Sequence, residues 1–323
     1  MKVFVTNPIP EIGIQLLKNA HFEILQGYND TTISDWESLC HQADVLLNVG
    51  YAKFDKAFFE KFKNIKAIAL FSVGYDSVDV HQAYLNHILV GNTPDVLSKA
   101  TSDISFLLMQ SVARRMNYNL NKVKDGTWDN FDALEAIGQE LYGKTIGIFG
   151  LGRIGFEMAK KCKYAFDMNV IYHNRNRNLQ AEKDLEAEYV TFAELVEQSD
   201  VLSVHANYTK EKAGIFNKEV FGKMKSNAIF VNTARGGFHN EEDLYQALIN
   251  ENIWGAGLDV TNPEPMIHTN KLLDLPTVCV LPHIGSATIE ARNGMAKRSA
   301  ENLIAFSKSE KMPYCINPEV YSV

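Results

Sequence analysis

The chain has 323 residues, which is too long for one ordinary hydrophobic core and comfortable for two domains. Hydrophobic residues make up 46% of it and charged residues 22%, the balance of a folded globular protein. The formal net charge of −7 argues against a sequence-independent nucleic-acid binder, because such a protein needs a basic face.

The cysteine pattern and the N-terminus narrow the class further. Cys40, Cys162, Cys279 and Cys315 are far apart in the sequence, so they predict neither a zinc site nor a disulfide framework. Met1–Val5 leads directly into a strand-like run without a signal-peptide pattern, and no apolar run reaches the length of a membrane span. We therefore expect a cytoplasmic protein with no metal ion and with no membrane or nucleic-acid partner.

In the first part of the chain, short apolar runs alternate with amphipathic stretches, and this alternation predicts βαβ units with a parallel sheet. Asn92–Asp95, which contains a proline, then breaks the pattern and predicts a domain boundary. One long helix is expected to follow, over Val96–Met116. The strands expected before the boundary are Lys2–Thr6, Val45–Val49, Ala67–Phe71 and Ile88–Val90, and the helices there include Glu11–Ala20 and Lys56–Phe62.

A second alternating series contains six expected strands, enough for a full doubly wound sheet. These strands are Thr145–Phe149, Asn169–Tyr172, Val201–Val204, Ala228–Asn232, Gly255–Asp259 and Val278–Leu281. A last helix, Ile289–Ser307, lies beyond them and is placed to return to the first domain. We predict an α/β fold of two Rossmann-like or flavodoxin-like parallel-sheet domains with the active site in the cleft between them. The substrate domain is expected to combine residues 1–95 with 288–323, and the dinucleotide-binding domain to cover residues 96–287.

The stretch Gly150-Leu151-Gly152-Arg153-Ile154-Gly155 fits the pattern G-x-G-x-x-G and lies between an expected strand and the helix Phe156–Ala165. In that context the first glycine permits a tight turn, the second lets a pyrophosphate approach, and the third lets helix and strand pack closely. Free N–H groups at the helix N-terminus then bind the phosphates. The alternative is a purely structural turn, but the strand, helix and spacing together favour dinucleotide binding.

The residues after the second strand of this series bear on the choice of cofactor. NAD enzymes usually place a carboxylate about twenty residues after the glycine loop, where it binds the ribose hydroxyls. Here the local sequence, Tyr172–Arg177, contains no carboxylate and two arginines, Arg175 and Arg177. Because a guanidinium pairs with a 2′-phosphate that a carboxylate would repel, this favours NADP(H) over NAD(H), although NAD(H) stays possible. Two solvated surface arginines are the alternative interpretation.

Three chemically distinctive side chains follow three strands of the second series. Arg235, Glu264 and His283 all come after strand ends, so a parallel sheet would bring them to one edge, where ligands bind. A histidine can donate a proton near neutral pH, and a neighbouring carboxylate stabilises and orients the imidazolium. An arginine binds a carboxylate and polarises a carbonyl. Each residue alone has a structural explanation; together they suit the reduction of a 2-keto acid.

With these motifs in this order, the sequence resembles the D-isomer-specific 2-hydroxyacid dehydrogenase family over nearly its whole length. The resemblance rests on Gly150–Gly155, Val231–Gly237, Gly257–Val260 leading to Glu264-Pro265, and Leu281–Gly285. It implies that His283 is the acid/base, Glu264 its partner and Arg235 the substrate anchor. The substrate contacts it implies are Val73, Gly74, Arg235 and His283. The cofactor contacts it implies are Thr101, Gly150, Gly152, Arg153, Ile154, Gly155, Asn174, Arg175, Arg177, His205, Thr233, Asp259, His283 and Gly285.

Within the family, the arginines after Tyr172 resemble the NADPH-preferring glyoxylate/hydroxypyruvate reductase branch. Glu264 stands where the formate dehydrogenase branch has glutamine, which weighs against that activity. The stretch Gly126–Leu141, with Trp128 and Phe131, resembles the arm through which family members form homodimers, and is equally consistent with a monomer's loop.

Two other functions remain open at this point. The fold also serves non-catalytic NAD(H)-sensing modules, since fold alone does not set function. A sugar-acid reductase acting on a compound such as 2-ketogluconate is the other alternative. That choice depends on the size of a pocket expected near Asn48, Val49, Val73 and Met266.

Overall fold

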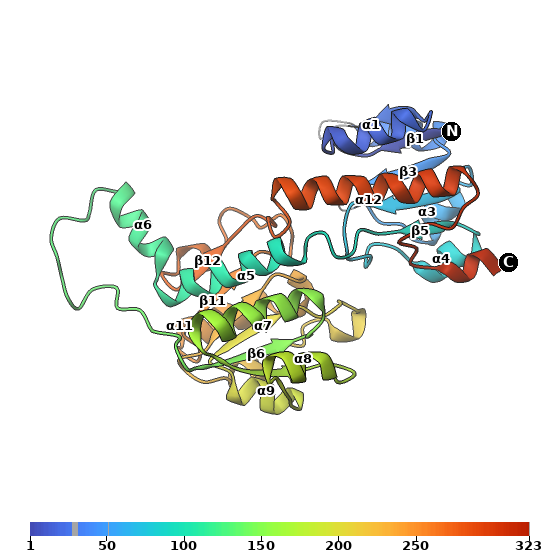
Figure 1. The fold of residues 1–323 in the computed structure, drawn as a ribbon. Helices are drawn as coiled ribbons and strands as arrows, with labels where there is room; N and C mark the ends of the chain where they lie inside the picture. The colour runs from blue at the N-terminus through green and yellow to red at the C-terminus, as the bar shows by residue number, and fades with distance from the viewer. Residues whose placement is uncertain (28–31, 51, 323) are drawn as a thin grey trace. The chain divides into compact units, whose positions relative to one another are not determined.

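The computed structural model describes residues 1–27, 32–50 and 52–322, and the chain forms two compact units (Figure 1). One unit consists of Met1–Leu97 and Ala287–Val323, and the other of Ser98–Ser286. Each unit is built on a single parallel sheet, which confirms the predicted α/β fold class. Among the described residues, no helix combines the length and the apolarity needed to cross a bilayer.

The first unit has a five-stranded sheet in the order β2-β1-β3-β4-β5. Its strands are β1 (Lys2–Val5), β2 (Glu23–Gln26), β3 (Val45–Asn48), β4 (Ala67–Leu70) and β5 (Leu89–Gly91). Its helices are α1 (Glu11–Asn19), α2 (Ile33–Gln42), α3 (Lys56–Lys61), α4 (Val80–Leu85) and α12 (Ile289–Ser307), with a final 3₁₀ turn at Pro318–Ser322. Strands β3 and β4 are buried along their whole length, which explains their continuous apolar sequences. Thr32, Asp55 and Asp79 cap α2, α3 and α4 through their side-chain oxygens.

The last long helix, α12, belongs to this first unit, where it packs against α1, β3 and β4 (Figure 1). The approach to α1 is close, because a Cβ built on Gly13 would lie 2.9 Å from the Cβ of Ala296. Beyond α12, the buried Asn317 accepts a hydrogen bond from Val90 N and donates one to Ile88 O. The C-terminal segment is thereby tied to the edge strand β5.

The second unit has a seven-stranded sheet in the order β12-β11-β10-β9-β6-β7-β8. From β6 the chain builds outward to β8, then returns to β9 on the other side of β6, so the switch point lies between β6 and β9. The strands are β6 (Thr145–Phe149), β7 (Asn169–His173), β8 (Glu188–Tyr189), β9 (Val201–Val204), β10 (Ile229–Asn232), β11 (Gly255–Leu258) and β12 (Val278–Val280). The helices are α5 (Ser98–Ala113), α6 (Met116–Lys124), α7 (Arg153–Phe166), α8 (Leu179–Leu185), α9 (Phe192–Gln198), α10 (Lys218–Phe221) and α11 (Glu241–Ile249), and 3₁₀ turns cover Lys210–Lys212, Gly236–Phe238 and Lys271–Asp274.

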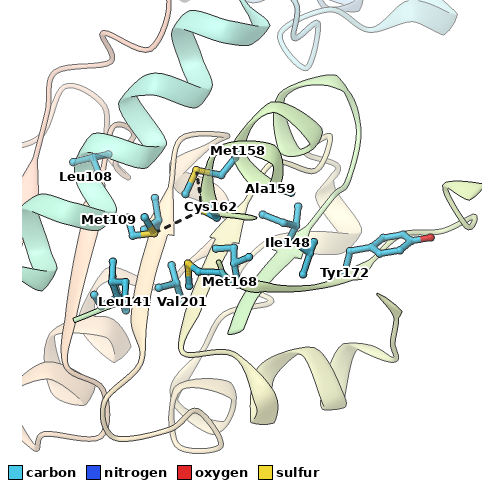
Figure 2. Close-up of a cluster of buried hydrophobic side chains, with 14 of the residues drawn as sticks. Leu108, Met109, Leu141, Ile148, Met158, Ala159, Cys162, Met168, Tyr172 and Val201 are labelled. Atoms are coloured by element: carbon cyan, nitrogen blue, oxygen red, sulfur yellow. Dashed lines mark hydrogen bonds between the residues drawn. The ribbon is translucent and has the colours of Figure 1, made fainter. Parts of the chain in front are cut away.

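Alternate residues of these strands enter separate hydrophobic clusters on the two faces of the sheet. Ile229 and Val231 of β10 belong to one cluster, and Phe230 between them belongs to the other. Figure 2 shows the first cluster, in which Met109 of α5 and Met158 and Cys162 of α7 meet. The Cys162 sulfur lies 3.9 Å from that of Met109, and burial raises the pKa of its thiol. Cys162 is therefore a packing residue rather than a reactive thiol.

The predicted secondary structure was wrong in two respects. Strands β2 and β8 were missed, because both are edge strands without the buried apolar run of the central strands, and β8 has only two residues. The helix expected over Val96–Met116 is α5 (Ser98–Ala113), which ends three residues earlier than expected, and the helix α6 (Met116–Lys124) that follows it was not predicted. Arg115 has a left-handed φ of 50°, and its guanidinium lies over the Trp254 ring, 4.8 Å from the centroid. The carbonyl of Ala113 accepts a hydrogen bond from Gln139 N instead of continuing the helix.

Candidate active site

The glycine loop joins β6 to α7 at the switch point of the sheet. Gly150 has a φ of +100°, and a Cβ there would lie 2.3 Å from Ala206 N. A Cβ on Gly155 would lie 2.5 Å from the carbonyl oxygen of Gly150, so helix and loop touch backbone to backbone. A Cβ on Gly152 would have no described atom within 4 Å. The first and third glycines thus permit close packing, while the second faces open space at the N-terminus of α7, where N–H groups bind phosphate.

Two predicted cofactor residues, Asn174 and His205, make protein contacts around this loop. Asn174 Oδ1 accepts a hydrogen bond from Leu151 N at 2.6 Å. His205 N donates to Phe149 O, and its Nε2 lies 2.8 Å from the Ser203 hydroxyl. Burial lowers the pKa of His205 to about 3, so its ring is neutral at physiological pH. Both residues hold the loop in shape.

The two arginines beyond β7 have different surroundings. Arg177 makes a two-pronged ion pair with Glu182, with Nε 3.0 Å from Oε1 and Nη2 2.6 Å from Oε2. The Tyr172 hydroxyl also donates to Glu182, at 2.6 Å. Arg175 is exposed at the same turn. The guanidinium of Arg177 is therefore already paired within the protein, which leaves Arg175 as the main candidate for binding a 2′-phosphate.

His283 and Glu264 meet as predicted, beyond the ends of the neighbouring strands β12 and β11. Their side chains are hydrogen-bonded to each other through His283 Nδ1 and Glu264 Oε1. The histidine side chain is 39% exposed and the glutamate 18%, so the pair opens to solvent on the histidine side. His283 itself has a left-handed φ of 54°.

Asp259, at the end of β11, holds the backbone just after His283. Its two oxygens accept hydrogen bonds from Ile284 N and Gly285 N, each at 2.8 Å. Asp259 is 1% exposed, and burial raises the pKa of its carboxyl although both backbone bonds lower it. A Cβ on Gly285 would lie 3.0 Å from Asp259 Oδ2 and 3.1 Å from Thr101 Cγ2. Thr101, Asp259 and Gly285, all predicted cofactor residues, are therefore neighbours.

Arg235 follows β10, which lies beside β11 in the sheet. Asn232 pairs in register with Leu258, and Leu258 with Val280. Arg235, Glu264 and His283 therefore leave the same edge of three adjacent strands, as the sequence predicted. Arg235 Nη1 donates to Ala234 O at 2.7 Å, and the hydroxyl of the nearby Thr233 lies 2.7 Å from that of Ser105.

The predicted substrate loop, Val73–Gly74, belongs to the first unit and follows β4. The Ser72 hydroxyl donates to Gly74 O at 2.7 Å, and Asn92 Nδ2 donates to Val73 O at 2.8 Å. At the end of the adjacent β3, Val49 N donates to the Thr6 hydroxyl at 2.8 Å. Side-chain hydrogen bonds thus fix the backbone of both loops.

The structure adds residues that the sequence did not single out. Glu241 accepts hydrogen bonds from Asn262 N at 2.6 Å and from Asn270 Nδ2 at 2.9 Å, and so holds the loop that carries Glu264. Asn232 and His239, both buried, hydrogen-bond to each other beneath Arg235. Asn232 lies in the stretch Val231–Gly237 that carries the resemblance but was given no role there, and no pattern pointed to His239 or Glu241.

The chain is similar to known proteins along its whole length. The model of the family described as D-isomer specific 2-hydroxyacid dehydrogenase, NAD binding domain, matches residues 106–285. The glyoxylate reductase of Thermococcus litoralis is 40% identical over 326 residues, which cover 99% of this chain and 97% of that protein. The glyoxylate reductase/hydroxypyruvate reductase of Mus musculus is 38% identical over 97% of both chains. The crystal structure of an NADPH-dependent glyoxylate/hydroxypyruvate reductase from Sinorhizobium meliloti, in complex with NADP and malonate, is similar with a TM-score of 0.82 at 28% identity, covering 98% of this chain and 97% of that one.

Proposed function

The chain belongs to the D-isomer-specific 2-hydroxyacid dehydrogenase family, and from this premise we propose that it reduces a 2-keto acid of the size of glyoxylate or hydroxypyruvate to the D-2-hydroxy acid. As a family member it is an NAD(P)-dependent 2-hydroxyacid oxidoreductase. The small substrate is suggested by the relatives, several of which are glyoxylate reductases at about 40% identity.

The observation that carries the proposal is the His283–Glu264 pair at the sheet edge from which Arg235 also extends. We assign Arg235 to the substrate, where its planar guanidinium pairs with the carboxylate and polarises the keto oxygen. His283 then donates the proton from Nε2 as negative charge develops on that oxygen. Glu264 holds the ring through Nδ1 and so fixes which nitrogen faces the substrate. Val73 and Gly74 contribute backbone groups for the substrate carboxylate.

The residues around the glycine loop fit a dinucleotide. Gly152 leaves room for a pyrophosphate beside the first N–H groups of α7, which have no side-chain cap. Thr101 and Asp259 are assigned to the nicotinamide end, next to His283. When bound, a nicotinamide cofactor supplies the hydride. We further propose a preference for NADPH, because no carboxylate follows β7 and Arg175 is exposed there.

The chain also offers a surface for homodimer formation. Trp128 is 68% exposed and Phe131 is 92% exposed in the segment between α6 and β6. Glu135 anchors this segment by accepting hydrogen bonds from Tyr118 and Lys122 of α6. We propose that a second copy of the chain covers the rings of Trp128 and Phe131.

We also propose that the protein works in the cytoplasm.

The proposal is tested by measuring the rates of NADPH and NADH oxidation with four candidate substrates: glyoxylate, hydroxypyruvate, pyruvate and 2-ketogluconate. We expect fast turnover of the two- and three-carbon acids, with NADPH preferred. Turnover of 2-ketogluconate alone would replace the small substrate by a sugar acid. Cofactor binding without any turnover would contradict the enzyme assignment and favour a sensing module.

Arg235→Ala tests the substrate anchor, and Arg114→Ala is the control, because Arg114 is an exposed arginine directly after α5. Loss of a charged hydrogen-bonded contact is expected to raise KM for glyoxylate by about 10-fold or more and to lower kcat. The control should retain both values. An unchanged KM in Arg235→Ala would contradict the anchor role.

A further inference from the structure

The loop that carries Arg235 is anchored on one buried amide, that of Asn232, the last residue of β10. Asn232 is 0% exposed, and its side chain makes three hydrogen bonds. Its Oδ1 accepts from Ala234 N at 3.0 Å, and its Nδ2 donates to Arg235 O at 2.9 Å. The same Nδ2 lies 3.0 Å from Nδ1 of His239. One side chain therefore holds the backbone on both sides of the Arg235 Cα.

The polarity of this network is determined by its backbone members. A backbone N–H only donates and a carbonyl only accepts, so the Asn232 amide can have only one orientation, and its second N–H points to His239. Nδ1 of His239 must then be an acceptor, which places the ring proton on Nε2. His239 is 2% exposed, and its Nε2 has no hydrogen-bond partner among the described residues. Burial lowers the pKa of His239 to about 4, so the ring remains a neutral acceptor at physiological pH.

His239 is itself held from the other side. It follows the 3₁₀ turn Gly236–Phe238, and the backbone on both sides of it bonds to Phe216. Phe216 N donates to Phe238 O, and Asn240 N donates to Phe216 O, each at 3.0 Å. Asn232 is the residue before the loop 233–238, and His239 is the residue after it. The hydrogen bond between them therefore joins the two ends of the loop that carries Arg235.

We propose that Asn232 and His239 form a positioning pair for Arg235, closing the loop 233–238 so that the guanidinium is presented to the substrate carboxylate in one place. This inference rests on the proposed function, which assigns Arg235 to the substrate. Neither residue is assigned a contact with the substrate, so both act through Arg235. Their effect is expected on substrate binding and turnover, because a displacement of about 1 Å can lower a rate by about 100-fold.

Asn232→Asp is the first test, because it keeps the shape of the side chain and replaces the Nδ2 donor by an oxygen. That oxygen faces Arg235 O and His239 Nδ1, both of which are acceptors. We expect KM for glyoxylate and the inhibition constant of oxalate, a non-reacting dicarboxylate, to rise by about 10-fold, the usual effect of one lost hydrogen bond. The Kd of NADPH, measured by fluorescence, should rise less than KM for glyoxylate does, because Thr233 is the one predicted cofactor contact that lies in this loop and the glycine loop follows a different strand.

Asn317→Asp is the matched control. Asn317 is also 0% exposed and also bridges two backbone groups, Val90 N and Ile88 O, but it lies in the first unit. Each substitution removes buried hydrogen bonds, so both Asn232→Asp and the control Asn317→Asp should lower Tm. Only Asn232→Asp should raise KM for glyoxylate. An equal rise of KM in both variants would overturn the proposal, because a general loss of stability would then explain it.

Two substitutions of His239 provide an independent test, which decides the matter if Asn232→Asp fails to fold. His239→Phe keeps a ring of similar size and removes the acceptor, whereas His239→Asn restores an acceptor oxygen near the position of Nδ1. We expect His239→Phe to raise KM for glyoxylate and His239→Asn to recover most of the loss. If His239→Phe and Asn232→Asp fold and keep the parent KM while Arg235→Ala does not, the positioning role is refuted and the proposed function stands. If Arg235→Ala also keeps the parent KM, the proposed function itself fails at this residue.

Discussion

Substituting Gly236 by alanine should strongly reduce the activity of the candidate active site, although none of its side chains is replaced. Gly236 follows Arg235 and lies where the Arg235 loop crosses the loop that carries Glu264. A Cβ on Gly236 would lie 1.9 Å from the carbonyl oxygen of Thr261 and 2.2 Å from its carbonyl carbon. Both atoms are backbone atoms, so no side-chain rotation relieves the clash. Reaching an ordinary contact of 3.4 Å requires the two loops to separate by about 1.5 Å.

The expected size of the effect follows from this displacement. Overpacking of a tightly packed site typically costs about 1–3 kcal/mol of unfolding free energy. A displacement near 1 Å of groups that contact the substrate costs about 100-fold in rate, so we expect kcat/KM with glyoxylate to fall by about 100-fold or more. The glycine loop lies after β6, whereas the predicted cofactor residues Thr233 and Asp259 are close in sequence to this crossing, so NADPH binding should weaken less than kcat/KM falls.

The assay is steady-state NADPH oxidation with glyoxylate, combined with cofactor binding and thermal unfolding. Gly222→Ala is the control, because Gly222 has a φ of −69° and a Cβ there would meet its nearest neighbour at 3.2 Å. That variant should keep its activity. If Gly236→Ala folds and its kcat/KM stays within about threefold of the parent value, the predicted effect of separating the two loops is refuted, because that effect should be about 100-fold.

Three other predictions follow from the site and its surroundings. His283→Ala should lower kcat by about 100-fold or more, because proton donation belongs to the transition state; an unchanged kcat in single-turnover measurements would exclude His283 as the acid. Arg175→Ala should raise KM for NADPH and leave that for NADH unchanged, whereas equal losses would remove Arg175 from the phosphate site. Stability should fall as the pH drops from 6.5 to about 4, because burial lowers the pKa of His239 from 6.5 to about 4 and the unfolded chain binds the proton first. The full contribution of His239, present above pH 6.5, is about 3 kcal/mol. Because burial also lowers the pKa of His205, which acts in the same direction, His239→Asn should reduce but not abolish the slope of urea-unfolding free energies measured between pH 5 and 7, a change that a structural role alone would not produce.

The features that the sequence predicted best are those that depend on neighbours in the chain. The glycine loop needs a strand before it, a helix after it and three glycines at fixed spacing, and all of these are local. The placement of Arg235, Glu264 and His283 also followed from local signals, because a parallel sheet brings the ends of its strands to one edge. Knowing that each residue follows a strand was enough, without knowing any contact.

The features that were missed depend on residues far apart in the sequence. The break between α5 and α6 arises where Gln139 N takes the Ala113 carbonyl and Trp254 packs on Arg115, and neither contact leaves a trace in the local pattern. The Asn232–His239 bond also leaves no local pattern, because in the sequence a histidine that will be buried beside a 3₁₀ turn cannot be told from an ordinary polar residue. Its burial and its single available protonation state emerge only from the packing around it.

The arginines beyond β7 show how such a contact changes a functional prediction. Composition alone treats Arg175 and Arg177 as equal candidates for a 2′-phosphate. The ion pair with Glu182 neutralises Arg177, and Glu182 also accepts from Tyr172, so the pair is part of the folded structure. The discrimination between NADPH and NADH then depends mainly on the guanidinium of Arg175. A single charge-assisted contact contributes about 1.5–3 kcal/mol, which corresponds to a preference of about 10- to 100-fold. We therefore expect NADPH to be preferred by that factor and NADH to remain a usable cofactor.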